Sequence, residues 1–97
     1  MSIPYTREVA ELVALFSPTA AQTESIRVFL SKKEASVSIQ FCNHTMSAKM
    51  RDRRYSYYIA EDSQDVAGYI PFPTFPEMKE SIRVQAEAII EKEGEKS

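Results

Sequence analysis

Two side chains near the middle of the chain are candidates for chemistry. The sequence has one cysteine and one histidine, Cys42 and His44, separated by a single residue. A cysteine–histidine pair acts as a nucleophile only when a third group orients the imidazole, and the pattern indicates no such group. Two ligands also fall short of the four that a structural zinc ion takes. We therefore predict no metal site and no cofactor, with Cys42 as a small apolar residue and His44 in an exposed loop.

Other catalytic patterns are equally weak. Gly68 and Gly94 are the only glycines, which excludes the familiar glycine-rich loops that hold phosphate groups. The adjacent acids Glu61 and Asp62 fall in an expected open loop over residues 61–66, a poor setting for acid–base catalysis. A single cysteine cannot form an internal disulfide, which suits a reducing cytosol. We expect a protein that is not an enzyme and that acts by binding.

Basic residues gather in the middle of the chain. The net charge of −2 divides into −2 over residues 1–26, +5 over residues 27–54 and −5 over residues 55–97. This segregation predicts either an acidic C-terminal segment that lies near the basic loop or a two-faced surface for a partner of complementary charge. A merely solvated surface is the third interpretation.

The densest basic cluster is a candidate contact surface. Lysine and arginine bind phosphates or acidic groups, and the tyrosines that follow could stack on bases. A sequence pI of about 5.4 argues against an ordinary basic DNA-binding domain, so direct nucleic-acid contact is a secondary expectation. The predicted contact residues of this cluster are Lys49, Arg51, Arg53 and Arg54.

A proline-rich segment over residues 68–76 is the second candidate contact. Its three prolines make it extended or turning, because proline lacks an N–H and fixes φ. One interpretation packs Ile70, Phe72 and Phe75 onto the core, and the other presents the aromatic rings to a protein that grips an extended segment. X–Pro bonds isomerise slowly, so the segment is also a candidate substrate for a prolyl isomerase. The predicted contact residues here are Tyr69, Pro71, Phe72, Pro73, Phe75 and Pro76.

Two helices are predicted to precede the basic cluster. Apolar residues recur at helical spacing over residues 4–16. A second helix is predicted over residues 18–33, because Ser17 and Pro18 form a good helix start. The same stretch also fits a strand, and this alternative stays open. The strand would place three apolar residues on one face: Ile26, Val28 and Leu30.

Alternating apolar and polar residues predict two strands, over residues 37–41 and 55–59, that pair as an antiparallel hairpin. Residues 43–54 are predicted as a long basic loop between them. A tight two-residue turn is not expected, because neither Asn-Gly nor Asp-Gly occurs there. A last helix is predicted from Pro76 to Gly94.

These elements predict a small α+β domain over residues 1–97. It has two N-terminal helices, an antiparallel β-hairpin, a proline-rich loop and a C-terminal helix. With 43% hydrophobic and 27% charged residues, the composition is typical of a soluble globular protein. No stretch approaches the roughly 20 apolar residues of a membrane span, and no secretory signal is expected. The order of elements also permits a small winged helix-turn-helix that binds nucleic acid.

A small acidic protein with segregated charge, no catalytic set and a proline-rich segment resembles the accessory proteins of bacteriophages. In size and in its segment from Ile70 to Pro76, it most resembles the anti-RecBCD modulators of P22-like phages. The resemblance implies a non-enzymatic protein of the host bacterial cytoplasm that binds the RecBCD helicase–nuclease, through its RecC subunit, and alters its processing of DNA ends. A host prolyl isomerase would be a second partner. The chain also resembles the small anti-CRISPR proteins, which implies binding to a CRISPR effector complex as the alternative.

Overall fold

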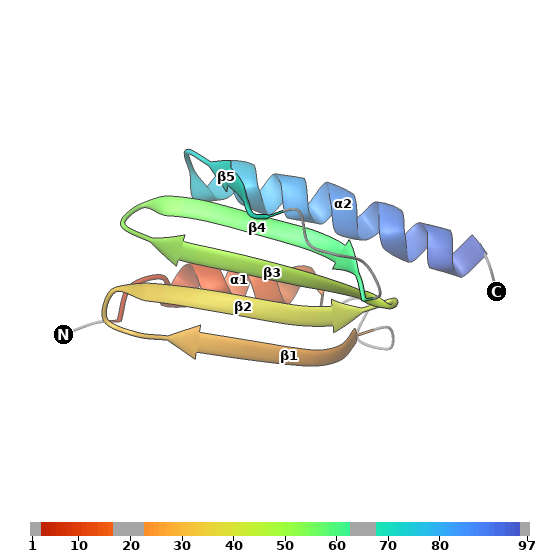
Figure 1. Cartoon of the computed structure of the whole chain (residues 1–97), viewed down its shortest axis with the longest axis horizontal. Helices are drawn as coiled ribbons and strands as arrows, with labels where there is room; N and C mark the ends of the chain where they lie inside the picture. The colour runs from red at the N-terminus through yellow and green to blue at the C-terminus, as the bar shows by residue number, and fades with distance from the viewer. Residues whose placement is uncertain (1–2, 17–22, 63–67, 96–97) are drawn as a thin grey trace.

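Five antiparallel strands form a sheet in the computed structural model, which also has two helices and describes residues 3–16, 23–62 and 68–95. The strands lie side by side in chain order, so each pairs with the next (Figure 1). The molecule is an α+β domain with this sheet and two helices. Its elements are α1 Thr6–Leu15, β1 Thr23–Leu30, β2 Glu34–Phe41, β3 His44–Arg51, β4 Arg54–Glu61, β5 Ile70–Phe72 and α2 Phe75–Glu95.

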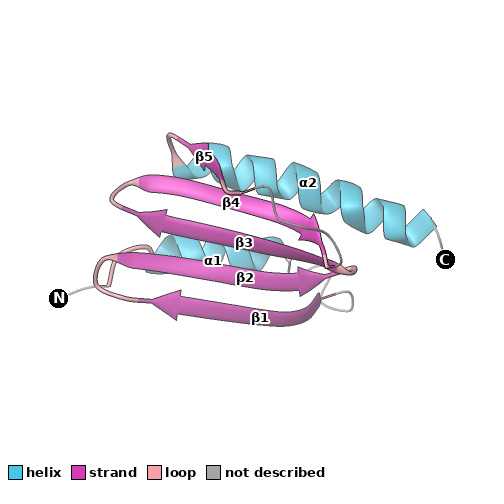
Figure 2. Ribbon diagram, viewed as in Figure 1, coloured by secondary structure: helices cyan, strands magenta, loops and turns pink. Residues whose placement is uncertain are grey.

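Both helices pack on the same face of the sheet, which gives the molecule two layers (Figure 2). Every second residue of β2 and β3 is buried under them, as the period of two in a strand requires. α1 contributes Val9 and Leu12 to this core, and α2 contributes Met78, Ile82 and Ala86. The other face of the sheet is covered by no described element, so its side chains meet solvent.

Two tight turns connect the central strands. Cys42 and Asn43 join β2 to β3 with φ of 47° and 60°, and Asp52 and Arg53 join β3 to β4 with φ of 50° and 61°. Positive φ at both central residues matches the twist of a two-residue hairpin. The prediction that such turns are absent is wrong, because asparagine and aspartate tolerate the left-handed region without glycine.

The prediction of a long loop over residues 43–54 is also wrong, because tight turns at both ends leave room for a strand between them. Most of it is β3, which pairs with β2 on one side and β4 on the other. The two predicted strands are confirmed as parts of β2 and β4, but they do not pair with each other. The core-facing residues of β3 are Met46, Ala48 and Met50, all fully buried.

The predicted second helix is also wrong over the part that the structure describes. Residues 23–30 form β1, while residues 17–22 lie outside the described ranges. Ile26 and Val28 pair with Ile39 and Val37 of β2, as the alternative strand requires. A winged helix-turn-helix needs a helix here, so that architecture does not fit.

The remaining elements agree with the predictions from the sequence. The first helix and the last helix are confirmed, although α2 begins at Phe75 and continues to Glu95. The proline-rich segment is extended, as predicted, and its residues 70–72 form the edge strand β5. Proline is tolerated there because an edge strand leaves half of its N–H groups unpaired.

Candidate binding surface

The uncovered face of the sheet collects the polar residues that alternate with the core. Facing residues on neighbouring strands form rows across it. One row contains Arg27, Ser38, Ser47 and Tyr58, and the next contains Phe29, Ser36, Lys49 and Ser56. The serines of these rows bring hydroxyl groups to the surface, between basic and aromatic side chains.

Tyr69 folds onto this face from the segment before β5. Its hydroxyl and the Ser47 hydroxyl are 2.9 Å apart, within hydrogen-bond distance. The Lys49 ammonium lies 4.6 Å from the centre of the Tyr69 ring, a cation–π contact. The Tyr58 ring meets the same ring edge-on, with centroids 5.0 Å apart. Tyr69 therefore joins the proline-rich segment to the basic cluster.

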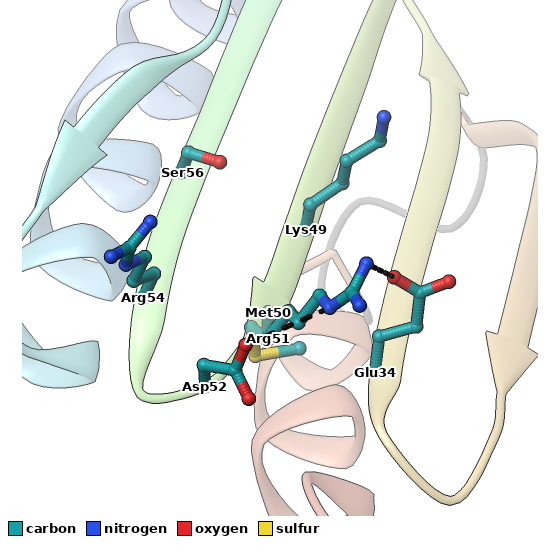
Figure 3. Close-up of a pocket in the computed structure, with 7 residues that line it drawn as sticks. All are labelled: Glu34, Lys49, Met50, Arg51, Asp52, Arg54 and Ser56. Carbon is teal, nitrogen blue, oxygen red and sulfur yellow. Dashed lines mark ion pairs between the residues drawn. The ribbon is translucent and has the colours of Figure 1, made fainter.

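A hollow of about 460 Å³ opens on the same face, at the end of the sheet where β3 turns into β4. Figure 3 shows Lys49, Arg51 and Arg54 rising from these two neighbouring strands. The lining residues are Glu34, Lys49, Met50, Arg51, Asp52, Arg54 and Ser56. Three bases against two acids leave the hollow with a net positive charge.

The bases of the hollow differ in how far they are already neutralised. Arg51 lies 3.7 Å from carboxylate oxygens of both Glu34 and Asp52. These pairs are exposed and long, so each stabilises the fold by about 1 kcal/mol at most. Within residues 3–16, 23–62 and 68–95, neither Lys49 nor Arg54 has a carboxylate within 4.0 Å. These two are the bases best placed to meet an anionic group of a ligand.

Arg53 belongs to the turn beside the hollow rather than to its lining. Its amide donates a hydrogen bond of 2.9 Å to the Tyr5 hydroxyl, which ties the turn to the start of α1. The Tyr5 ring meets the Tyr55 ring edge-on at 6.2 Å. The backbone of Arg53 thus has a structural task, and its side chain is exposed at the rim.

The proline-rich segment divides between the two faces. Phe75 is buried in the core, and Phe72 is half-buried and stacked on Tyr57 with centroids 5.6 Å apart. These two rings are therefore not exposed knobs, and the interpretation that packs them onto the core is the correct one. Ile70 is the exception, because it stays 52% exposed.

The prolines of the same segment remain exposed. Pro71 pairs with Ser56 of β4, so it borders the hollow on the open face, and Pro73 and Pro76 follow it around the start of α2. Of the residues predicted for partner contact, the structure brings Lys49, Arg51, Arg54, Tyr69 and Pro71 to one surface.

The helix α2 is the most acidic of the described elements. α2, on the opposite side of the sheet, carries six acidic and three basic residues. Arg83 of α2 is engaged by Glu80 and Glu87, and its hydrogen bond lowers the pKa of Glu80. The acidic residues of α2 thus lie on the opposite side of the sheet from the basic hollow.

Cys42 and His44 lie at the turn between β2 and β3. The Nδ1 atom of His44 is 2.7 Å from the backbone carbonyl of Cys42, to which it can donate, and Cys42 occupies a turn. Burial, followed by the negative charges of Glu93 and Glu24, raises the pKa of the Cys42 thiol. A raised pKa lowers the thiolate fraction and with it the reactivity of the sulfur.

No group of three His, Cys, Asp or Glu side chains is placed to hold a metal ion in the described ranges. Among the helices described, none combines the length and the apolar character that crossing a membrane requires.

Sequence reasoning missed several members of the open face. Arg27, Ser38 and Ser47 share it with the basic cluster, yet none of them stands out in the sequence. The alternation of polar residues with Met46, Ala48 and Met50 is the signal that would have placed them, because it predicts β3 and therefore its outward face.

Comparisons with protein-family models, with curated proteins and with solved structures found no match for this chain.

Proposed function

We propose that this protein acts by stoichiometric binding, with no catalysis of its own, and that the open face of its sheet is the contact surface. The proposed partner is a bacterial DNA-processing complex in the host cytoplasm. RecBCD, bound through RecC, is the first candidate because of the phage resemblance, and a CRISPR effector complex is the alternative. The observation that supports a binding role is the net positive, hydroxyl-rich face set opposite acidic helices.

The chemistry of this face suits an anionic partner surface. Lys49 and Arg54 have no carboxylate within 4.0 Å among the described residues, so a partner's acidic side chains could pair with them without displacing an internal ion pair. The serines add hydrogen-bond donors between these charges. Segregated charge also raises the rate of association and orients the encounter, because an anionic partner attracts the basic side of the molecule and repels its acidic side.

Charge reversal on the open face tests this proposal. The protein is tagged and recovered from a nuclease-treated bacterial lysate, and binding to the purified complex is then measured directly. We expect K49E combined with R54E to weaken binding at least tenfold, since reversal replaces attraction by repulsion. K92E, on the exposed side of α2, is the matched control and should change binding less than twofold. Equal binding by the double variant and the control would refute this contact surface.

Direct binding of single-stranded nucleic acid is the second candidate function. It is favoured by the Tyr58 and Tyr69 rings beside Lys49, because aromatic rings next to bases are how single strands are held. Affinity for a labelled oligonucleotide would then fall with salt, at a logarithmic slope of about −0.7 per neutralised phosphate. An absent or salt-insensitive signal would remove this function and leave protein binding.

The exposed prolines support a proposal for a second partner. Pro71 and Pro73 lie at the edge of the sheet, where a host prolyl isomerase can reach the X–Pro bonds. Binding of the isomerase would then be independent of the charge reversals on the open face.

A further inference from the structure

The outer edge of β1 exposes an unusual amount of apolar surface. Figure 1 shows β1 as the last strand on its side of the sheet, and no described element pairs with its outer edge. Four apolar side chains of this strand remain exposed: Ile26 by 44%, Val28 by 47%, Phe29 by 53% and Leu30 by 37%. Ile26, Val28 and Leu30 share one face of the sheet, and Phe29 lies on the other. Exposed apolar side chains gathered along one strand mark an interaction site on a small protein.

The backbone of the same edge is available for pairing. At the turn into β2, the Ser31 amide donates to the Glu34 carbonyl at 2.9 Å, which makes these two residues a hydrogen-bonded pair. In an antiparallel ladder such pairs alternate, so Arg27 and Phe29 also direct their N–H and C=O groups to β2. Ile26, Val28 and Leu30 therefore direct theirs outward, where no described strand meets them.

We propose that β1 pairs with β1 of a second copy, antiparallel and about a two-fold axis through Val28, to form a homodimer with a continuous ten-stranded sheet. In this register Val28 faces Val28 of the second copy, and Ile26 faces Leu30. The side chains of these pairs lie on one side of the sheet. Their backbone N–H and C=O groups point away from β2, toward the second copy. Each pair can exchange two N–H···O bonds while it buries apolar surface.

The charged residues favour this register and oppose one of its neighbours. On the open face, Arg27 lies opposite Phe29 of the second copy, as a cation–π contact requires. Beyond the paired residues, Glu24 lies at the bulge near the start of β1 and Lys32 lies in the turn after β1, so each end brings an exposed acid toward an exposed base of the second copy. A shift by two residues in one direction would instead set Arg27 against Arg27 of the second copy, which places like charges opposite each other. The outer edge of β1 therefore suits pairing with its own copy in its apolar side chains and in the placement of its charges.

The symmetry of the pairing has a consequence for the open face. Facing residues lie on the same side of the sheet in an antiparallel pair, so both copies keep their helices on one side. The two basic faces then join into one surface with Arg27 near its centre. The inference does not depend on the proposed partner, because it concerns the free edge rather than the hollow.

Self-association is the first measurement. We expect sedimentation velocity from about 1 to 500 μM to show a monomer–dimer equilibrium in the micromolar range, because the interface is small. V28K places two like charges opposite each other on the axis, and the dissociation constant should rise at least tenfold. V84K is the matched control, since Val84 is 49% exposed on α2 and lies away from this edge. Circular dichroism and thermal melting show whether both variants remain folded.

A cross-linking experiment tests the register. In a C42S background, R27C and F29C copies are mixed and oxidised. Residues 27 and 29 face each other as a non-hydrogen-bonded pair, whose Cα separation of about 4.5 Å permits a disulfide. We expect the mixed heterodimer to form at least five times faster than cross-links within either variant alone.

Three results would overturn the proposal. The first is a wild-type protein that stays monomeric over the whole concentration range. The second is a V28K variant that associates as strongly as V84K. The third is a monomeric protein whose binding to a host complex is weakened by V28K but not by V84K, which would assign the edge to a strand of another protein.

Discussion

The two edges of the sheet differ in length, in backbone chemistry and in what they expose. β5 has three residues and contains Pro71, whereas β1 has eight residues and no proline. Along β5, Ile70 and Phe72 pair with Tyr57 and Tyr55 of β4. Because the Asp52–Arg53 turn makes Arg51 and Arg54 a hydrogen-bonded pair, alternation directs the backbone of Tyr55 and Tyr57 toward β5. Pro71 therefore occupies the outward position, where it has no N–H to donate.

This difference shows that one edge is closed and the other is open. Short strands and prolines are the usual means by which proteins prevent strand addition at an edge. β5 has both of these features, and α2 packs beside it. β1 has neither, and it adds exposed apolar residues to an outward-facing backbone. A chain that closes one edge so fully and leaves the other open is expected to use the open one.

The largest expected effect concerns the phenylalanines near the two edges. F75A removes a ring that is buried beside β5, and we expect it to lower the free energy of unfolding by about 3–4 kcal/mol. F29A removes a ring of β1 that is 53% exposed, and the loss should be less than about 1 kcal/mol. Urea unfolding of both variants measures the difference. Similar losses would mean that Phe75 is not part of the core, or that Phe29 is.

Proline substitutions give the next largest effect and test the backbone of β1 directly. The N–H of Arg27 points to β2, so R27P removes a ladder hydrogen bond and should destabilise the monomer by about 3 kcal/mol. The N–H of Val28 points outward, so V28P should destabilise it by no more than about 1 kcal/mol, as at an edge position that tolerates proline.

The same pair of variants separates folding from association. V28P is expected to leave the domain folded and to abolish self-association, because it deletes the central N–H of the proposed pairing. Thermal melting and sedimentation velocity on one sample measure both properties. If V28P destabilised the monomer as much as R27P, the assigned alternation of the backbone would be wrong.

The sequence is sufficient to predict those helices and strands whose buried face is marked by an uninterrupted apolar period. The first and last helices, and the cores of β2 and β4, each show an uninterrupted apolar period, and each is confirmed. β3 was missed because its outward residues, Lys49 and Arg51, resemble a charged loop. Its flanking turns also use Cys42 and Arg53 in the left-handed region, where glycine is the expected signal.

β1 was misassigned for a different reason. Phe29 is exposed on the face opposite Ile26 and Leu30, so the three residues together imitate the spacing of a helix. Period-two alternation is clear only when one face is buried, and β1 buries neither face fully. The feature that hid this strand in the sequence is the same apolar exposure that supports its pairing with a second copy.

The sequence predicts the basic character of the open face, but it does not identify all of the residues that form this face. The basic cluster is evident from the sequence, and Lys49, Arg51 and Arg54 do lie together. Arg27 and the serines join them only through strand pairing, which no local pattern specifies. The sequence alone does not decide whether Phe72 and Phe75 lie in the core or on a contact surface, because aromatic residues suit both settings.

The smallest expected effect is a substitution at the closed edge. Ile70 is 52% exposed, close to the 47% of Val28, so I70K matches V28K in exposure and in the charge it introduces. We expect I70K to change the dissociation constant of the dimer by less than twofold, because Pro71 prevents β5 from accepting another strand. Sedimentation velocity at matched concentrations measures it beside V28K. An I70K variant that dissociates the dimer as V28K does would show that copies meet through β5, and the contrast between the two edges would then be reversed.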